Sequence, residues 1–157
     1  MLIGHGNSSG KPLYLKAMKR FIDAQENSYA AALSEIKNGR KESHWMWYIF
    51  PQIAGLGYSQ ISRFYAIKDL AEATMYLQHE LLGKHLIEIS QALLDLNTDN
   101  AYEIFGSPDD IKLCSSMTLF AQVNNAPPVF KKVLDKFFNG KADDKTLQLL
   151  SPDVLQG

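Results

Sequence analysis

Apolar side chains recur at the spacing of an α-helix along almost the whole chain, from about Tyr14 to Leu150. Segments that alternate with a period of two are few, and valine is scarce, so strands have little support. The longest periodic stretch has one polar face and one apolar face, the latter formed by Leu82, His85, Leu86, Ile89, Leu93 and Leu96. The pattern predicts an all-α protein, a compact single-domain orthogonal array of about seven to nine helices.

Residues that favour helix ends divide this pattern into separate helices. Capping-box sequences begin at Asp69 and at Asn100, and each predicts the first turn of a helix. Ser107, followed by Pro108 and two acidic residues, also predicts a helix start, with Ser107 as the cap. The pair Asn139-Gly140 is typical of a helix C-terminus.

Length and charge limit the domain organisation and the classes of partner. We expect a flexible extension over residues 1–13, which is rich in Gly and Ser, and a single helical domain over residues 14–157. The formal net charge is −1, so nucleic acid is not expected as a partner. No apolar run approaches the roughly 20 residues that span a membrane, the start does not resemble a secretory signal, and Cys114 is the single cysteine. We therefore expect a cytoplasmic protein without a membrane partner.

Both tryptophans lie in the aromatic segment Ser43–Gln52, the first candidate site. A helix is favoured over a strand there, because Met46, Ile49 and Phe50 would share one helical face. Aromatic rings at Trp45 and Trp47 offer flat surfaces for a base or ribose, and His44 is a candidate acid or base near neutral pH. The alternative is that both tryptophans lie in the core and His44 makes a capping hydrogen bond.

The glycines that follow, Gly55 and Gly57, would let a ligand approach the backbone closely. Ser59 can begin a further helix, and Arg63, one turn later, would add positive charge to the same region. This continuation favours a binding role for the aromatic segment.

The second candidate site is the helix predicted after Ser107. Asp109 and Lys112 share a helical face, and Ser115 and Ser116 follow one turn later. Serines are weak helix formers in mid-helix unless their hydroxyls bond the backbone or a ligand. The alternative is a local ion pair and acids that complement the helix dipole, without a ligand.

Other kinds of site find no support in the sequence. The four histidines and single cysteine lack the spacing of metal ligands, so no metal site is expected. The glycines near the N-terminus have no preceding strand and no Lys-Ser/Thr pair, so they do not form a phosphate loop. No cofactor is expected.

Two motifs together resemble a bacterial family of unknown function whose members are sometimes labelled calpastatin. The first consists of Arg40-Lys41, the segment Ser43–Gln52 and the glycines after it, and the second runs from Ile104 to Phe120. The resemblance implies a mainly helical domain with the two motifs as walls of a pocket. Calpain inhibition is not expected, because inhibitor segments are disordered and repetitive, whereas this chain is 11% aromatic and has no repeats. A distant similarity to the helical NADAR group would link the chain to ADP-ribose or related N-glycosides.

These observations lead to two hypotheses. In the first, a nucleotide-like or ribose-phosphate molecule binds between the two motifs; the candidate binding residues are Trp45, Trp47, Gln52, Lys112, Ser115 and Ser116, and the candidate catalytic residue is His44. In the second, the protein is a non-enzymatic interaction module, whose aromatic segment is core or forms an exposed apolar surface around Tyr48 and Phe50. Nucleic-acid binding ranks third and would require Arg40, Lys41, Arg63 and Lys68 on one face.

Overall fold

The computed structural model of the chain describes residues 11–151, with side chains from residue 16 onward. Within this range all regular elements are helices, and one isolated parallel bridge joins Ile53 to Ile67. The ten helices are α2 (Lys11–Glu26), α3 (Tyr29–Lys37), α4 (Met46–Ile49), α5 (Gln60–Tyr65), α6 (Leu70–Gln78), α7 (Glu80–Leu94), α8 (Ala101–Phe105), α9 (Asp109–Ala121), α10 (Val129–Phe138) and α11 (Asp144–Leu150). The all-α prediction is confirmed, although the ten helices of the described residues exceed the predicted seven to nine.

The predicted N-terminal extension differs in part from the structure. Residues 1–10 lie outside the described residues, but α2 already begins at Lys11, three residues before the predicted helix start at Tyr14. Pro12 is compatible with this earlier start, because amides of the first helical turn have no partner within the helix.

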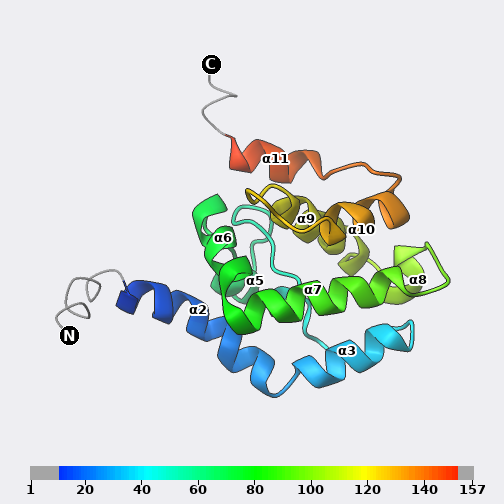
Figure 1. The fold of residues 1–157 in the computed structure, drawn as a ribbon, viewed down its shortest axis with the longest axis horizontal. Coiled ribbons are helices and arrows are strands. Elements are labelled where there is room, and N and C mark those ends of the chain that lie inside the picture. The colour runs from blue at the N-terminus through cyan, green and yellow to red at the C-terminus, as the bar shows by residue number, and fades with distance from the viewer. Residues whose placement is uncertain (1–10, 152–157) are drawn as a thin grey trace.

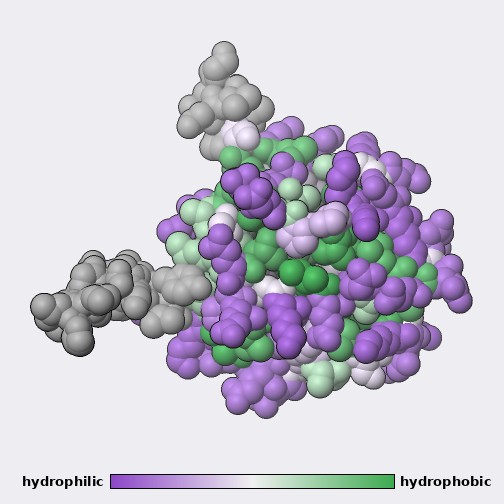
Figure 2. Space-filling model, viewed as in Figure 1, coloured by the Kyte–Doolittle hydropathy of each residue, from purple (hydrophilic) through white to green (hydrophobic). Residues whose placement is uncertain are grey.

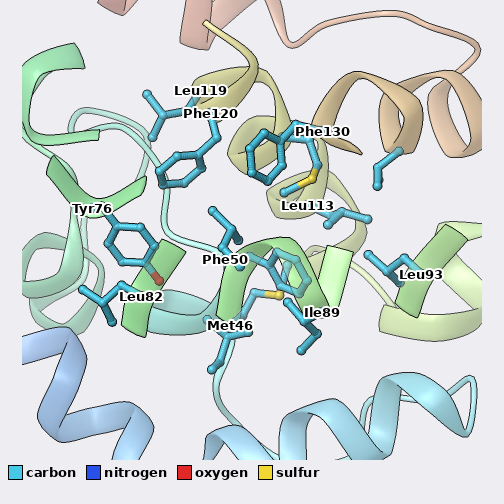
Figure 3. Close-up of a cluster of buried hydrophobic side chains, with 14 of the residues drawn as sticks. Met46, Phe50, Tyr76, Leu82, Ile89, Leu93, Leu113, Leu119, Phe120 and Phe130 are labelled. Carbon is cyan, nitrogen blue, oxygen red and sulfur yellow. The ribbon is translucent and has the colours of Figure 1, made fainter. Parts of the chain in front are cut away.

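Helix α7 runs through the middle of the molecule and organises the core (Figure 1). It packs against α3, α6 and α10, while α9 packs against α6, α8, α10 and α11. Four residues of the predicted apolar face are buried, Leu82, Leu86, Ile89 and Leu93, while His85 and Leu96 are partly buried. Figure 3 shows Leu82, Ile89 and Leu93 in one buried cluster with Phe120 of α9 and Phe130 of α10. The helix predicted in the aromatic segment is a single turn, α4, and its residues Met46 and Ile49 are buried with Phe50 in the same core.

Most predicted helix ends are confirmed, and one is made differently. The side chains of Asp69 and Asn100 accept the amides three residues later, at 2.9 and 3.3 Å, and Asn139 ends α10 with a left-handed φ of 56°. Ser107 does not cap α9. The amide of Asp110 donates instead to the carbonyl of Gly106, whose φ of 71° turns the chain into the helix.

A buried amide, Gln25 of α2, joins four helices through polar contacts. Its Nε2 donates to the carbonyl oxygen of Tyr48 at 2.8 Å and to the hydroxyl of Tyr76 at 2.9 Å. Its Oε1 lies 2.8 Å from Nδ1 of His85, whose ring stacks on Tyr29 with centroids 3.6 Å apart. Since Gln25 is only 2% exposed, these bonds replace water that it cannot reach. The network fixes the carbonyl end of α4 against α2, α6 and α7.

Hydrophilic side chains cover most of the molecular face that Figure 2 shows, and hydrophobic ones gather between them toward its centre. Across residues 11–151, no helix has the length and apolar character needed to cross a membrane. The apolar residues are instead placed on helix faces that meet in the common core.

We expect Gly83→Ala to destabilise the protein, although alanine normally favours a helix. A Cβ at Gly83 would lie 2.0 Å from the carbonyl oxygen of Leu77, because α6 turns directly into α7. The free energy of unfolding in urea should fall by about 2 kcal/mol or more, a typical cost of overpacking. The exposed helical control Ser34→Ala should change it by less than about 0.5 kcal/mol. An unchanged or higher stability of Gly83→Ala would contradict the close packing of α6 on α7.

Candidate functional site

Glu35, on α3, holds the loop that leads into the aromatic segment. Its Oε1 accepts hydrogen bonds from the amides of Glu42 and Ser43 at 2.8 and 2.9 Å and from Nε1 of Trp45 at 2.9 Å. Its Oε2 accepts from the Ser43 hydroxyl at 2.6 Å. Partial burial raises the pKa of the Glu35 carboxyl, but these hydrogen bonds outweigh burial and lower the pKa to about 2. The carboxylate is therefore ionised over the whole physiological range.

The two tryptophans occupy different environments. Trp45 is 1% exposed, and its ring lies near those of Phe50 and Phe105, with centroids 6.2 and 6.4 Å away. With its indole N–H bonded to Glu35, Trp45 belongs to the core and does not line the cavity described below. Trp47, two residues later on the one-turn helix α4, is only partly buried.

Asp109 joins the two sequence motifs through two lysines. One carboxylate oxygen lies 3.1 Å from Nζ of Lys41, and the other lies 3.5 Å from Nζ of Lys112. Each ammonium also lies over a tryptophan ring: Lys41 is 5.0 Å from the Trp45 centroid, and Lys112 is 5.3 Å from the Trp47 centroid. Lys112 and Trp47, predicted to share a site, are therefore in contact.

A cavity of about 100 Å³ lies beside Trp47, on the side of the molecule formed by α5. It is lined by Trp47, Gln52, Ser62, Arg63 and Tyr65 and by a chain segment that contains both glycines. Of the predicted binding residues, Trp47 and Gln52 line this cavity, and Lys112 reaches it only through its contact with Trp47.

Neither serine of α9 lines this cavity, and Ser115 instead contacts the start of α11. The hydroxyl of Ser115 donates to the carbonyl of Ile111 at 3.3 Å and to Oδ2 of Asp143 at 3.2 Å. The hydroxyl of Thr118 accepts the amide of Asp143 at 2.8 Å. Ser116 is fully buried, and its hydroxyl finds no hydrogen-bond partner among the described residues. The hydroxyls of Ser115 and Thr118 thus fasten the start of α11, which explains these two weak helix formers but not Ser116.

His44 is exposed in the loop before α4 and does not line the cavity. Its backbone carbonyl accepts a hydrogen bond from the Tyr48 hydroxyl at 3.4 Å. Sequence reasoning did not single out Glu35, because its partners lie seven to ten positions away in a loop, beyond the range of helical spacing.

The structure also bears on two other kinds of site, a reactive thiol and a metal site. Burial, together with the nearby Asp143, raises the pKa of the Cys114 thiol to about 11, so the thiol is protonated at neutral pH. Within the part of the chain that the structure describes, three or more His, Cys, Asp or Glu residues do not come together as metal ligands would.

The chain belongs to the DUF1810 family, described as a protein of unknown function, which it matches over residues 15–150. It is also similar to a solved structure, the crystal structure of the conserved hypothetical protein Rv1873 from Mycobacterium tuberculosis. The two sequences are 46% identical, the match covers 85% of this chain and 96% of that chain, and the TM-score is 0.83. No curated protein matches the chain. The resemblance to a family of unknown function is confirmed, and neither description mentions calpain.

We expect Glu35→Gln to destabilise the protein by about 2 kcal/mol at neutral pH, because hydrogen bonds to a charged acceptor are lost. The wild-type protein should also lose stability as the pH falls from 4.5 to about 2. In that window the unfolded chain protonates Glu35, while the folded chain keeps it ionised.

Chemical denaturation at several pH values tests this expectation, with Glu42→Gln as the control. Glu42 is exposed, and only its backbone amide bonds Glu35, so its replacement should leave stability within about 0.5 kcal/mol. Equal effects of the two substitutions would refute the anchoring role of Glu35.

Proposed function

We propose that this DUF1810 protein binds a small anionic molecule, of the ribose-phosphate or nucleotide-like class, in the cavity beside Trp47. The observation that carries the proposal is the combination of a partly exposed tryptophan ring with two cations. Arg63 lines the same cavity as Trp47, and the Lys112 ammonium lies 5.3 Å from the Trp47 ring centroid. Aromatic rings bind the faces of bases and sugars, and guanidinium groups bind phosphate with two parallel hydrogen bonds.

The charges around the cavity favour an anion. Among the described residues, the ion pairs do not include Arg63, so its guanidinium keeps its donors for a ligand. Lys41, Asp109 and Lys112 together carry one net positive charge, because a single carboxylate serves two ammonium groups. Gln52 adds an amide, which can donate to and accept from sugar hydroxyls.

The size of the cavity limits which part of a ligand it can enclose. Sites for whole drug-sized molecules measure about 300–1,000 Å³. A cavity of about 100 Å³ instead suits one phosphate or ribose unit. The remainder of a nucleotide-like ligand would lie on the partly exposed surface of Trp47, next to Lys112. The proposed function is binding, and no catalytic role is given to His44 or to any other residue.

The competing hypothesis is that the protein is an interaction module. Its support comes from apolar residues around α5 and not from the predicted surface around Tyr48 and Phe50. Phe50 is fully buried, and Tyr48 is partly buried, so they form no exposed apolar patch. Tyr58, Ile61 and Phe64, around α5, are instead 77%, 39% and 59% exposed. This patch makes protein binding the second candidate function.

Nucleic-acid binding and calpain inhibition receive no such support. The side chain of Lys41 is only 8% exposed and is paired with Asp109, so it cannot join Arg40, Arg63 and Lys68 at a phosphate backbone. The described residues form a packed helical core, unlike the disordered segments that inhibit calpain.

Isothermal titration calorimetry with ribose phosphate, ADP-ribose and common nucleotides tests the proposal. We expect at least one of these compounds to bind, and Arg63→Gln to weaken its affinity by about tenfold or more, because a charge-assisted contact is lost. Trp47→Ala should weaken the affinity similarly.

The matched control is Arg40→Gln, which removes an exposed arginine that does not line the cavity. The affinity of the Arg40→Gln protein for the same compound should stay within about twofold of the wild-type value. Equal loss in both arginine variants would indicate a general charge effect. Absence of binding by every compound would contradict the proposed ligand class and favour the interaction module.

A further inference from the structure

We propose that residues 54–66, which include α5, form a lid that opens to admit the ligand and carries Arg63 onto it when it closes. This inference deepens the proposed function and rests on it for the identity of the ligand. Movement of the lid, however, can be measured with no ligand present, so the two proposals can fail separately.

The ends of this segment are fixed to the body of the protein. The amide of Ala54 donates to the carbonyl of Ile67, and the amide of Ile67 donates to the carbonyl of Gln52, both at 2.8 Å. Ile53 and Ile67, which form the bridge, are 3% and 0% exposed. The chain thus leaves the core and returns to it at one closed base, as in an Ω-loop.

Above this base the segment is held lightly. None of the residues of α5 is buried, in contrast to the helices packed around α7. Its contacts with the body are few: the Tyr65 ring approaches those of Phe21 and Tyr48, with centroids 5.8 and 5.2 Å apart, Leu56 packs against the core, and Gly55 lies against the side chain of Leu149. Next to the base, Nη2 of Arg20 donates to the carbonyl of Ala66 at 2.9 Å. Segments with few buried apolar groups open at lower free energy than the core does. The loop can therefore detach while its base stays closed.

The lid and the cavity share most of their residues. Three lining residues, Trp47, Gln52 and Ile53, lie before the lid, and the remaining seven lie within residues 54–66. Removal of this segment from its closed position would expose Trp47 and Gln52 to solvent. It would also make room for a ligand larger than a cavity of about 100 Å³ can enclose.

Arg63 is then a specificity-determining residue placed by lid closure. It lies on α5 and lines the cavity, although its side chain is otherwise exposed. A bound phosphate would attract the guanidinium and favour the closed lid, because the ligand makes this contact only in that state.

Thiol labelling measures the opening directly. In a Cys114→Ser background, Ser62→Cys places a reporter on the cavity wall, and Ser34→Cys on α3 is the exposed control. We expect dithionitrobenzoate to label the Ser62→Cys protein about tenfold or more slowly than the control, with little dependence on urea at low concentration. Adding Tyr65→Ala should speed labelling about tenfold, whereas Tyr102→Ala, an exposed tyrosine on α8, should not.

Three results would overturn the lid. In the first, the labelling rate of the Ser62→Cys protein depends on urea as global unfolding does. In the second, this rate equals that of the Ser34→Cys control. In the third, Tyr65→Ala leaves the rate unchanged. If Tyr65→Ala fails to fold, Leu149→Ala loosens another contact of the loop and must also accelerate the labelling.

The ligand is tested in a separate arm with ribose phosphate. We expect it to slow the labelling of Ser62→Cys, and Arg63→Gln to remove this slowing. If labelling shows a lid but ribose phosphate, ADP-ribose and nucleotides leave the rate unchanged, the lid stands and the proposed function fails.

Discussion

The carboxylate of Glu35 is the interaction on which the candidate site depends. It accepts four hydrogen bonds from residues 42–45 and thereby fixes a loop that has no regular structure of its own. One of these bonds satisfies the indole of Trp45, which lets that ring enter the core without an unpaired donor. Because α4 follows directly, the position of Trp45 also determines where Trp47 is presented.

A second constraint is the pairing of buried or partly buried polar groups between segments distant in the sequence. Gln25 of α2 fixes the end of α4 by a hydrogen bond to the Tyr48 carbonyl. Asp109 of α9 fixes the loop before α4 through its ion pair with Lys41. Such pairs cost more to break than they gain on forming, since a single deletion leaves a partner buried and unpaired. They therefore favour one relative placement of the helices, which apolar packing alone would specify less sharply. The cavity beside Trp47 is a product of that placement.

The sequence was sufficient for the helices and for most of their ends. Apolar periodicity located α7, and local side-chain chemistry located the caps at Asp69 and Asn100, because both signals act within one or two turns. It could not distinguish the two tryptophans. Residues two apart in a helix point about 200° apart, so either ring could have faced the core. The deciding contact comes from Glu35, ten residues before Trp45.

The serines of α9 were ambiguous for a similar reason. Their unusual position in mid-helix was visible in the sequence, but the partner of Ser115 is Asp143, 28 residues later. Arg63 could be noted only as a nearby charge, since its place on the cavity wall follows from the bridge between Ile53 and Ile67. Helical spacing predicts local faces, whereas this site is built by contacts between segments distant in sequence.

The most direct test of the site is a ¹H–¹⁵N NMR titration with ribose phosphate, observing the two indole N–H resonances. Trp47 lines the cavity, while Trp45 is buried and bonded to Glu35, so the Trp45 indole is an internal control. We expect the Trp47 resonance and the amides of Gly55 and Gly57 to shift with saturation, while the Trp45 resonance stays nearly unchanged. Saturable shifts confined to other residues, or no shifts at all, would contradict a ligand site beside Trp47.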